Sequence, residues 1–337
     1  MRPSEKEKNL ELNLGKVCNN RCIFCLDGDA PRSARKWLPI ARARREMETA
    51  RAAGISSLGL LGGEPTAHPR ILELVRTARD MGFSRIALAS NGLKLSDPDF
   101  TAALVEGGVT RVGISIHGHT AAIEDALSGR KGNFERKVRA IANLLDLHRR
   151  GLLPHNVSLN AVLNRKNAGR MAPFCAFFRR MGIGDVRFNL IRTDACRERA
   201  KALTPRLEDL SREIEKTIAV NLRVLRMELS FGDIPLCVYP LAVLLDGKLA
   251  SRTIGEIRDL DTSCAVFQAP GDEAVDASRF RWVDKKRGSL KVKAEACRSC
   301  TATGPCEGVW RSYAELFGTE ALTPLRVRIA LGGAGKP

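Results

Sequence analysis

Three cysteines near the N-terminus have the spacing of a metal-cluster loop. Cys18, Cys22 and Cys25 form a C-x3-C-x2-C pattern that follows a candidate strand at residues 10–17. Three thiolates at this spacing can hold three irons of a [4Fe–4S] cube and leave its fourth iron open, where a small molecule can chelate. A structural zinc site needs four ligands, and the sequence offers no fourth Cys or His close by.

A glycine-rich corner further along points to the same kind of site. The apolar strand expected at residues 57–61 runs into Gly62, Gly63, Glu64 and Pro65. Paired glycines let a backbone come close to a ligand and leave its N–H and C=O groups unhindered. Alone, this sequence indicates only a strand-to-helix turn. Downstream of the cysteine motif, it indicates a ligand-binding corner.

Together the two motifs resemble the radical S-adenosylmethionine (radical SAM) superfamily, and Phe24, just before the last cysteine, also matches its pattern. The resemblance implies that the three cysteines bind a [4Fe–4S] cluster. It further implies that the Gly-Gly-Glu corner hydrogen-bonds the amino group of the methionine moiety of SAM. The implied activity is that of an enzyme. A reducing partner such as flavodoxin or ferredoxin supplies an electron that cleaves SAM, and the 5′-deoxyadenosyl radical takes a hydrogen atom from the substrate.

A strand-then-helix rhythm runs from residue 10 to about residue 195. Short apolar stretches predict strands at residues 10–17, 57–61, 85–89, 111–116, 157–163 and 185–191. Amphipathic stretches predict helices at residues 40–53, 69–81, 97–106, 134–150 and 168–181. The rhythm predicts an α/β fold: a partial (β/α)6 TIM barrel over residues 1–200, with its active site at the C-terminal strand ends. We expect residues 201–337 to form a small C-terminal auxiliary-cluster domain.

Further polar residues fall at predicted strand ends. In the superfamily, residues at such positions bind the ribose and carboxylate of SAM or pack on its adenine. With Phe24, Gly62, Gly63 and Glu64, the predicted cofactor-binding residues are therefore Ser90, Asn91, Ser115, Asn160 and Val162. The structural alternative is that Asn91 forms a turn with Gly92 and that Ser115 caps a backbone group.

Two residues are candidates for catalysis. His117 follows the fourth predicted strand and could act as an acid or base near neutral pH. Its alternative role is in the N-terminal environment of a helix at residues 120–127. Lys131 sits in a glycine-flanked loop on the same side and could bind a substrate carboxylate or phosphate. A solvated loop is the alternative there.

A second cysteine group lies near the C-terminus. Cys297, Cys300 and Cys306 form a C-x2-C-x5-C pattern, with Cys237 far upstream as the expected fourth ligand and Cys264 as its competitor. The pattern resembles the C-terminal half of the SPASM and twitch extensions of radical SAM proteins. No cysteine follows Cys306, so the sequence supports one auxiliary [4Fe–4S] cluster and not two. An open iron that grips the substrate and a zinc ribbon are the alternatives.

Composition limits the setting of this chemistry. The 337 residues are 44% hydrophobic and include ten cysteines, with no export signal and no apolar run long enough to span a bilayer. We therefore expect a cytoplasmic protein without membrane contact. The net charge of +17 comes from dispersed arginines, and aromatic residues make up only 5%, so a base-stacking nucleic-acid surface is not evident.

The substrate is the least determined part of the prediction. The primary expectation is a peptide or protein that is oxidatively modified, as in maturases of this superfamily. The barrel is expected to begin near residue 9, which leaves no N-terminal leader-binding domain and argues against that class. The alternative is a small molecule, a sugar or cofactor precursor, acted on by a dehydrogenase or cyclase. Modification of tRNA is the third possibility.

Overall fold

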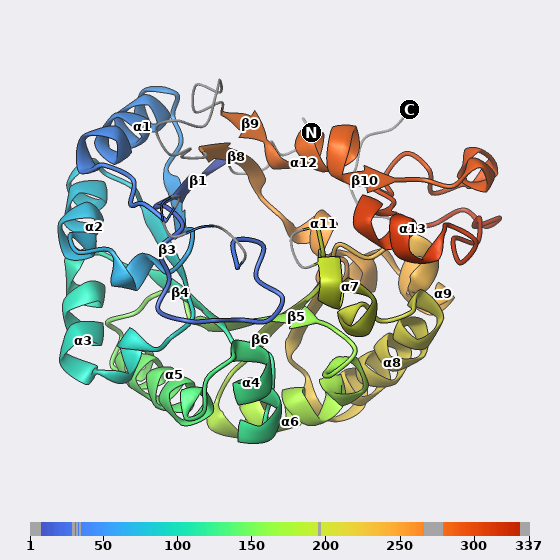
Figure 1. The fold of residues 1–337 in the computed structure, drawn as a ribbon, viewed down its shortest axis with the longest axis horizontal. Coiled ribbons are helices and arrows are strands. Elements are labelled where there is room, and N and C mark those ends of the chain that lie inside the picture. The colour runs from blue at the N-terminus through green and yellow to red at the C-terminus, as the bar shows by residue number, and fades with distance from the viewer. Residues whose placement is uncertain are drawn as a thin grey trace.

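One curved sheet with helices on its outer side makes up most of the protein (Figure 1). This computed structural model describes residues 8–28, 31, 33, 35–194, 197–265 and 279–330. Within these residues, nine strands pair in the order β7-β6-β5-β4-β3-β2-β1-β8-β9. The strands are β1 (Lys8–Asn13), β2 (Ser57–Leu61), β3 (Arg85–Ser90), β4 (Arg111–Ser115), β5 (Val157–Leu163), β6 (Asp185–Leu190), β7 (Glu228–Gly232), β8 (Asp261–Ala265) and β9 (Phe280–Arg281).

Helices alternate with the first six strands. They are α1 (Ile40–Ala52), α2 (Ile71–Asp80), α3 (Pro98–Gly107), α4 (Ala121–Ser128), α5 (Asn133–Arg149) and α6 (Met171–Met181). The strand pairs from β7 to β8 are all parallel, and β9 adds to β8 in the antiparallel sense. Parallel neighbours need crossover connections, and the helices of these crossovers surround the sheet at the left and bottom of Figure 1. The expected partial TIM barrel is confirmed, with β7 and β9 at its open edges.

The chain after residue 200 both extends this sheet and builds a small layer beside it. β7 and β8 continue the sheet beyond the six expected strands, and β8 joins the far side of β1. β10 (Lys291–Val292) and β11 (Val309–Trp310) form a separate antiparallel pair. The other helices are α7 (Arg197–Leu203), α8 (Leu207–Val220), α9 (Leu241–Leu245), α10 (Gly247–Thr253), α11 (Gly255–Arg258), α12 (Trp282–Lys285) and α13 (Arg311–Phe317). The domain division at residues 1–200 and 201–337 stays a prediction.

Burial alternates along the barrel strands. In β4, Val112 and Ile114 are buried beneath the helices, whereas Arg111, Gly113 and Ser115 are half-buried on the inner face. Successive side chains of a strand point to opposite faces, so the apolar set packs outward and the polar set lines the inside. The barrel therefore has an inner face of small and polar side chains.

One expected strand is shorter in the structure. The strand expected at residues 10–17 ends at Asn13, because Gly15 adopts a left-handed backbone conformation (φ 116°) and turns the chain away. Further along the chain, Asn221–Leu225 continues α8 as a helical turn. Arg226, at φ 52°, then ends this turn before β7 begins.

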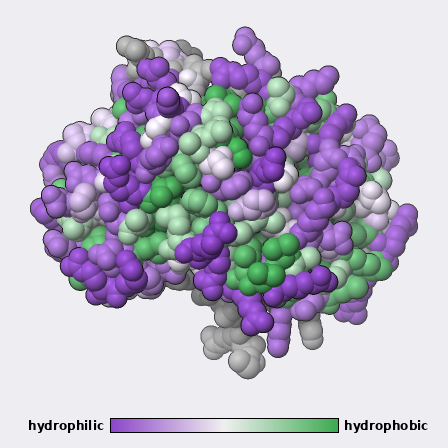
Figure 2. All heavy atoms as spheres, turned by 90° about the horizontal axis from the view of Figure 1, so that it is seen from below, coloured by the Kyte–Doolittle hydropathy of each residue, from purple (hydrophilic) through white to green (hydrophobic). Residues whose placement is uncertain are grey.

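The outer surface is mostly polar. The face in Figure 2 is largely hydrophilic, with apolar side chains gathered near its middle. Among the described residues, no helix is both long and apolar enough to cross a membrane.

Candidate functional site

The loop that carries Cys18, Cys22 and Cys25 crosses the open end of the barrel (Figure 1). Backbone hydrogen bonds clamp it on two sides. On one side, Gly63 N–H donates to Gly15 O at 2.7 Å, and Glu64 N–H donates to Val17 O at 2.9 Å. On the other side, Arg21 and Ile23 N–H donate to the carbonyls of Ser128 and Leu127, at 3.3 and 3.0 Å. The cysteine loop therefore lies between the corner after β2 and the end of α4.

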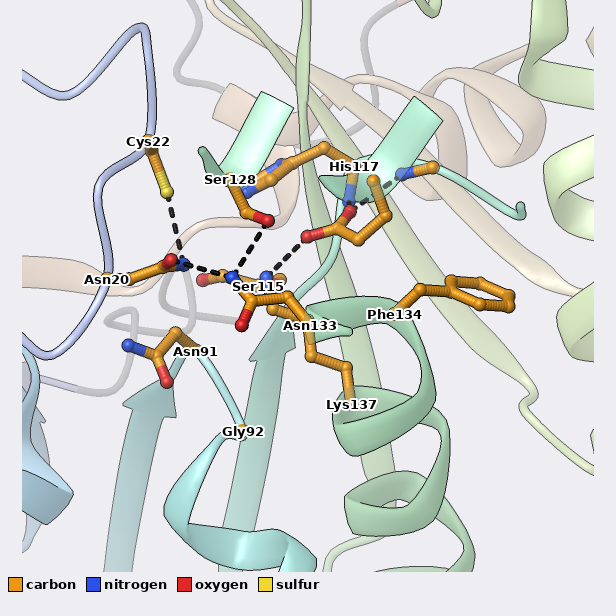
Figure 3. Close-up of polar contacts among 12 residues, drawn as sticks. Asn20, Cys22, Asn91, Gly92, Ser115, His117, Ser128, Asn133, Phe134 and Lys137 are labelled. Carbon is orange, nitrogen blue, oxygen red and sulfur yellow. Dashed lines mark hydrogen bonds and ion pairs between the residues drawn. The ribbon is translucent and has the colours of Figure 1, made fainter. Parts of the chain in front are cut away.

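Amide groups surround the sulfur atoms of this loop. The backbone N–H of Asn20 points at Cys18 Sγ at 3.4 Å, and its side-chain amide donates to Cys22 Sγ at 3.3 Å (Figure 3). Asn91 Nδ2 lies 3.7 Å from Cys18 Sγ. N–H donors stabilise negative charge on thiolates, which is the form that binds iron. Burial raises the pKa of Cys22 to about 12, so this thiol must release a proton when it binds a metal.

The paired glycines of the corner allow the cysteine loop to approach closely. Gly62 has φ 133°, and a Cβ there would lie 2.7 Å from both Asn13 Oδ1 and Gly15 O. A Cβ at Gly63 would overlap the carbonyl oxygen of Val17. The absence of side chains at both positions therefore serves the contact between corner and loop.

Glu64 has a role that the sequence did not reveal. Its carboxylate is 1% exposed and accepts four hydrogen bonds. Thr66 donates its N–H at 3.0 Å and its hydroxyl at 2.6 Å, Ser90 donates its hydroxyl at 2.7 Å, and Asn91 donates its N–H at 2.6 Å. The side chain thus fixes the end of β3, and its oxygens are occupied within the protein. The corner keeps only backbone groups for a ligand.

A buried ion pair fixes the end of β4. Lys137 Nζ lies 2.6 Å from Glu124 Oε1, and both side chains are fully buried. Lys137 also donates to Ser115 O at 2.8 Å. The other Glu124 oxygen accepts the N–H groups of His117 and Gly118, at 2.6 and 3.0 Å (Figure 3). The backbone turn from Ser115 to Gly118 is therefore held from α4 and α5.

His117 is held as a neutral ring. Its Nδ1 accepts the N–H of Val162 at 3.1 Å, and its ring meets Phe24 edge-on at 4.7 Å between centroids. Burial, and then the positive charge of Lys137, lower the pKa of His117 well below 6.5. Lys131 is exposed between α4 and α5. The prediction that these two residues are catalytic stays a prediction.

The other predicted cofactor residues fall at the same end of the barrel. Ser115 and Val162 are half-buried at the ends of β4 and β5. Asn160 is exposed on the inner face, where it accepts a hydrogen bond from Asn189 Nδ2 at 2.6 Å. Asn91 binds Asn19 Oδ1 through its amide at 2.8 Å. The structure therefore groups these residues, and their contact with SAM stays a prediction.

Charged side chains continue this polar lining deeper inside the barrel. Arg187 of β6 forms an ion pair with Asp259 and donates to Asn189 Oδ1 at 2.9 Å. On β1, Glu11 lies 3.6 Å from Cys264 Sγ, and burial raises the pKa of this carboxyl. A polar substrate would find partners here.

The C-terminal cysteines share one pocket. Cys237, Cys297, Cys300 and Cys306 all line it, together with apolar residues. Cys264 is instead in β8, in register with Glu11 of β1. Burial raises the pKa of Cys237 to about 11. This arrangement groups the three expected ligands with Cys237 and separates them from the competitor.

A charge cluster joins this pocket to the barrel. Glu307, adjacent to Cys306, groups with Asp233 and Glu256, and one carboxylate oxygen from each residue lies within 4.8 Å of the others. Lys291 and Lys286 each lie 2.8 Å from Glu307 Oε2. The two buried lysines balance much of the negative charge of the three carboxylates. The cluster therefore connects the cysteine pocket to the barrel through charged contacts.

An open parallel barrel with a three-cysteine loop across its strand ends defines a class of barrel proteins that hold an iron–sulfur cofactor at that end. Residues 12–165 match the family model described as the radical SAM superfamily. Residues 12–165 are therefore similar to the radical SAM domain, a family whose cofactors are a [4Fe–4S] cluster and SAM.

Curated relatives match part of the chain at moderate identity. Proteins named "Probable GTP 3′,8-cyclase" from Saccharolobus islandicus and Saccharolobus solfataricus are 29% and 30% identical over 184 residues, 53% of this chain and 55% of each relative. The namesake from Metallosphaera sedula is 27% identical over 220 residues, 64% of this chain and 65% of its own. The chain thus spans about half the length of the first two relatives.

Solved structures share the fold at low identity. Streptococcus suis SuiB bound to S-adenosylmethionine has a TM-score of 0.61 at 16% identity, covering 96% of this chain and 77% of that one. HydG, a maturase of the [FeFe]-hydrogenase, has a TM-score of 0.54 at 12% identity, covering 86% and 65%. These likenesses concern the fold alone.

Proposed function

We propose that this protein is a radical SAM enzyme that acts on a small polar molecule of the nucleotide class, with Cys18, Cys22 and Cys25 as the ligands of its SAM-binding cluster. The observation that carries the proposal is the cysteine loop clamped between the Gly62–Gly63 corner and α4, at the strand ends of the barrel. When bound, SAM and the cluster supply a 5′-deoxyadenosyl radical that can take a hydrogen atom from an unactivated C–H bond.

The protein residues have the properties that such a cofactor pair requires. Three thiols are half-buried, and two of them, Cys18 and Cys22, face amide donors from Asn20 and Asn91. The corner backbone at Gly62 and Gly63 carries no side chains, and Ser115 and Val162 lie half-buried toward the C-terminal ends of β4 and β5. The Glu64 carboxylate keeps the neighbouring strand end rigid, which preserves the geometry for a bound ligand.

The relatives favour the small-molecule alternative over the peptide expected first. The curated relatives described above are named as probable GTP 3′,8-cyclases, whereas the structural neighbour SuiB was solved with a precursor peptide and has 15% identity. The inner face agrees with a polar substrate, since Arg187, Asn189 and Asn160 form a hydrogen-bonded polar lining there. Peptide modification remains the second candidate, because the neighbour bound to the peptide covers 94% of this chain.

We further propose an auxiliary [4Fe–4S] cluster on Cys237, Cys297, Cys300 and Cys306. The four cysteines line one pocket, so they can supply one thiolate to each iron of a cube. A structural zinc ion bound by the same four thiolates is the alternative. A reducing partner of the flavodoxin or ferredoxin type completes the system.

The test is anaerobic reconstitution with iron and sulfide, followed by incubation with SAM and dithionite. We expect 5′-deoxyadenosine by mass spectrometry, and we expect GTP or another purine nucleoside triphosphate to accelerate its release. Substrate deuterated on the ribose should transfer its label to 5′-deoxyadenosine. Acceleration only by peptides would favour the second candidate. A reconstituted protein that releases no 5′-deoxyadenosine would contradict the proposed function.

A further inference from the structure

A line of buried polar side chains runs from α4 to the cysteine loop. Ser128, at the end of α4, is fully buried; Asn133, the first residue of α5, is 2% exposed; and Asn20, within the cysteine loop, is 8% exposed. Asn133 Nδ2 donates to Ser128 Oγ at 3.0 Å and to Asn20 Oδ1 at 2.9 Å. Figure 3 shows how the line ends at Cys22.

The bonds of this line fix which way the Asn20 amide faces. Its oxygen accepts from Asn133 and also from the backbone N–H of Arg21, at 3.0 Å. With the oxygen held by two donors, the Nδ2 group must face the other way, toward Cys22 Sγ at 3.3 Å. A flipped amide would lose both bonds and turn an oxygen toward the sulfur. Asn133 is the side-chain group, beside the backbone N–H of Arg21, that keeps a donor and not an acceptor directed at this sulfur.

A hydrogen-bond donor directed at this sulfur changes the reduction potential of a cluster bound there. The cluster gains one negative charge on reduction, and part of that charge resides on the cysteine sulfurs. An N–H group directed at a sulfur stabilises the reduced form more than the oxidised form, which raises the reduction potential. At a buried position, solvent screening of this effect is weak.

We propose that Asn133 is a positioning residue that raises the reduction potential of the Cys18/Cys22/Cys25 cluster by holding the Asn20 amide toward Cys22. This inference rests on the proposed function, because it requires the cluster to occupy that loop. Asn133 acts only through Asn20, so its effect must vanish when Asn20 is absent. That dependence distinguishes a positioning role of Asn133 from a general loss of protein stability in the variant.

The experiment is a redox titration of the reconstituted full-length protein, monitored by EPR. The signal followed is the one that changes on addition of SAM, which distinguishes this cluster from any auxiliary cluster. In Asn133→Ala and in Asn20→Ala, the ratio of reduced to oxidised cluster at the wild-type midpoint should fall about tenfold, which is 59 mV for a one-electron couple. Asn133→Ala in the Asn20→Ala background should produce no further shift.

The controls make the outcomes distinct. Asn143→Ala, on the same helix with its amide on Leu95 O at 3.0 Å, should leave the potential unchanged. If Asn133→Ala fails to fold, Ser128→Ala removes the acceptor that orients Asn133 and should shift the potential in the same direction. An unchanged midpoint in both variants, or an equal shift in the Asn20→Ala background, overturns the inference alone. A wild type without a SAM-responsive signal overturns the proposed function as well.

Discussion

The backbone N–H of Asn91 donates to the carboxylate of Glu64 at 2.6 Å, so the corner after β2 fixes the chain that follows β3. The amide of Asn91 in turn binds Asn19 Oδ1 of the cysteine loop at 2.8 Å. The Glu64 carboxylate thereby connects the ends of β2 and β3, and Asn91 connects both to the cysteine loop. Five experiments test this and the related contacts.

Glu64→Gln should destabilise the protein and weaken the site. The amide NH₂ would face at least one of the four donors that the carboxylate accepts, and leaving such a buried donor unpaired costs about 2 kcal/mol or more. Urea unfolding followed by circular dichroism measures the loss. Glu73→Gln, which removes an exposed partner of Arg70, is the matched control and should change stability by about 1 kcal/mol or less. Equal losses in the two variants would contradict the role of Glu64.

Gly63→Ala should lower the iron content of the first cluster. The added Cβ would overlap Val17 O and push the cysteine loop away from the corner. Iron and sulfide assays after reconstitution measure the effect, and release of 5′-deoxyadenosine should fall with it. Gly169→Ala, where a Cβ would meet nothing within 4 Å, serves as the control. A full iron content in Gly63→Ala would contradict the prediction, because it would show that the cysteine loop adapts to the added Cβ.

Lys137→Met should be one of the most damaging single changes. It leaves Glu124 buried without its cation, which costs about 3–5 kcal/mol. Chemical unfolding of the two single variants and of Lys137→Met/Glu124→Gln gives the coupling energy. We expect the double variant to be more stable than the sum of the single losses predicts. Strict additivity would mean that the pair contributes nothing as a pair.

Cys237→Ala and Cys264→Ala should differ in iron content. Cys237 shares the pocket of Cys297, Cys300 and Cys306, whereas Cys264 lies beside Glu11 in the sheet. The wild type should carry about eight irons in two cubes, and Cys237→Ala should lose up to about four of them. Cys264→Ala should keep all of them. Similar iron in both variants would favour an auxiliary cluster with an open iron, and zinc by metal analysis would contradict the cluster.

The pH dependence of stability should carry a contribution from His117. Its pKa is lowered on folding, so the unfolded chain binds more protons below about pH 6.5, and stability falls as the pH decreases through that point. His117→Asn keeps an acceptor for Val162 N–H but no titrating ring. Its unfolding free energy should fall less steeply between pH 6.5 and 5, by up to about 1.4 kcal/mol per pH unit. The exposed His155→Asn should retain the wild-type slope, and equal slopes in all three proteins would contradict the prediction.

The repeating strands were the most predictable part of the fold. β2 lies at residues 57–61 as expected, because an apolar run between turn residues leaves little choice of conformation. β8 escaped prediction, since Asp261–Ala265 is short and polar and becomes a strand only by pairing with the edge strand β1. Its conformation is set by a distant partner and not by its own residues.

The cysteines and glycines of the site were recognisable because their chemistry is local. The residues that support them were not, since Asn133 meets Asn20 only after α5 packs on the loop, and Glu124 meets the His117 backbone only after α4 packs on the end of β4. One signal was available: Lys137 lies on the same face of α5 as the buried Ile141 and Leu144, where a lysine needs a buried partner. The glycine pair was interpreted as space for a ligand, and the structure adds the closer reason, which is contact with the loop.

The pairing of β1 with β8 has a consequence for how the protein is made. Glu11 and Cys264 are neighbours across the sheet although 253 residues separate them in sequence. A ribosome therefore releases β1, and the cysteines just after it, long before the strand that completes its pairing exists. Contacts of such long range form slowly, because a large loop must close first. We infer that, during much of translation, the thiols lie next to a β1 strand that has not yet paired with β8. Iron is therefore best delivered after β8 has been translated.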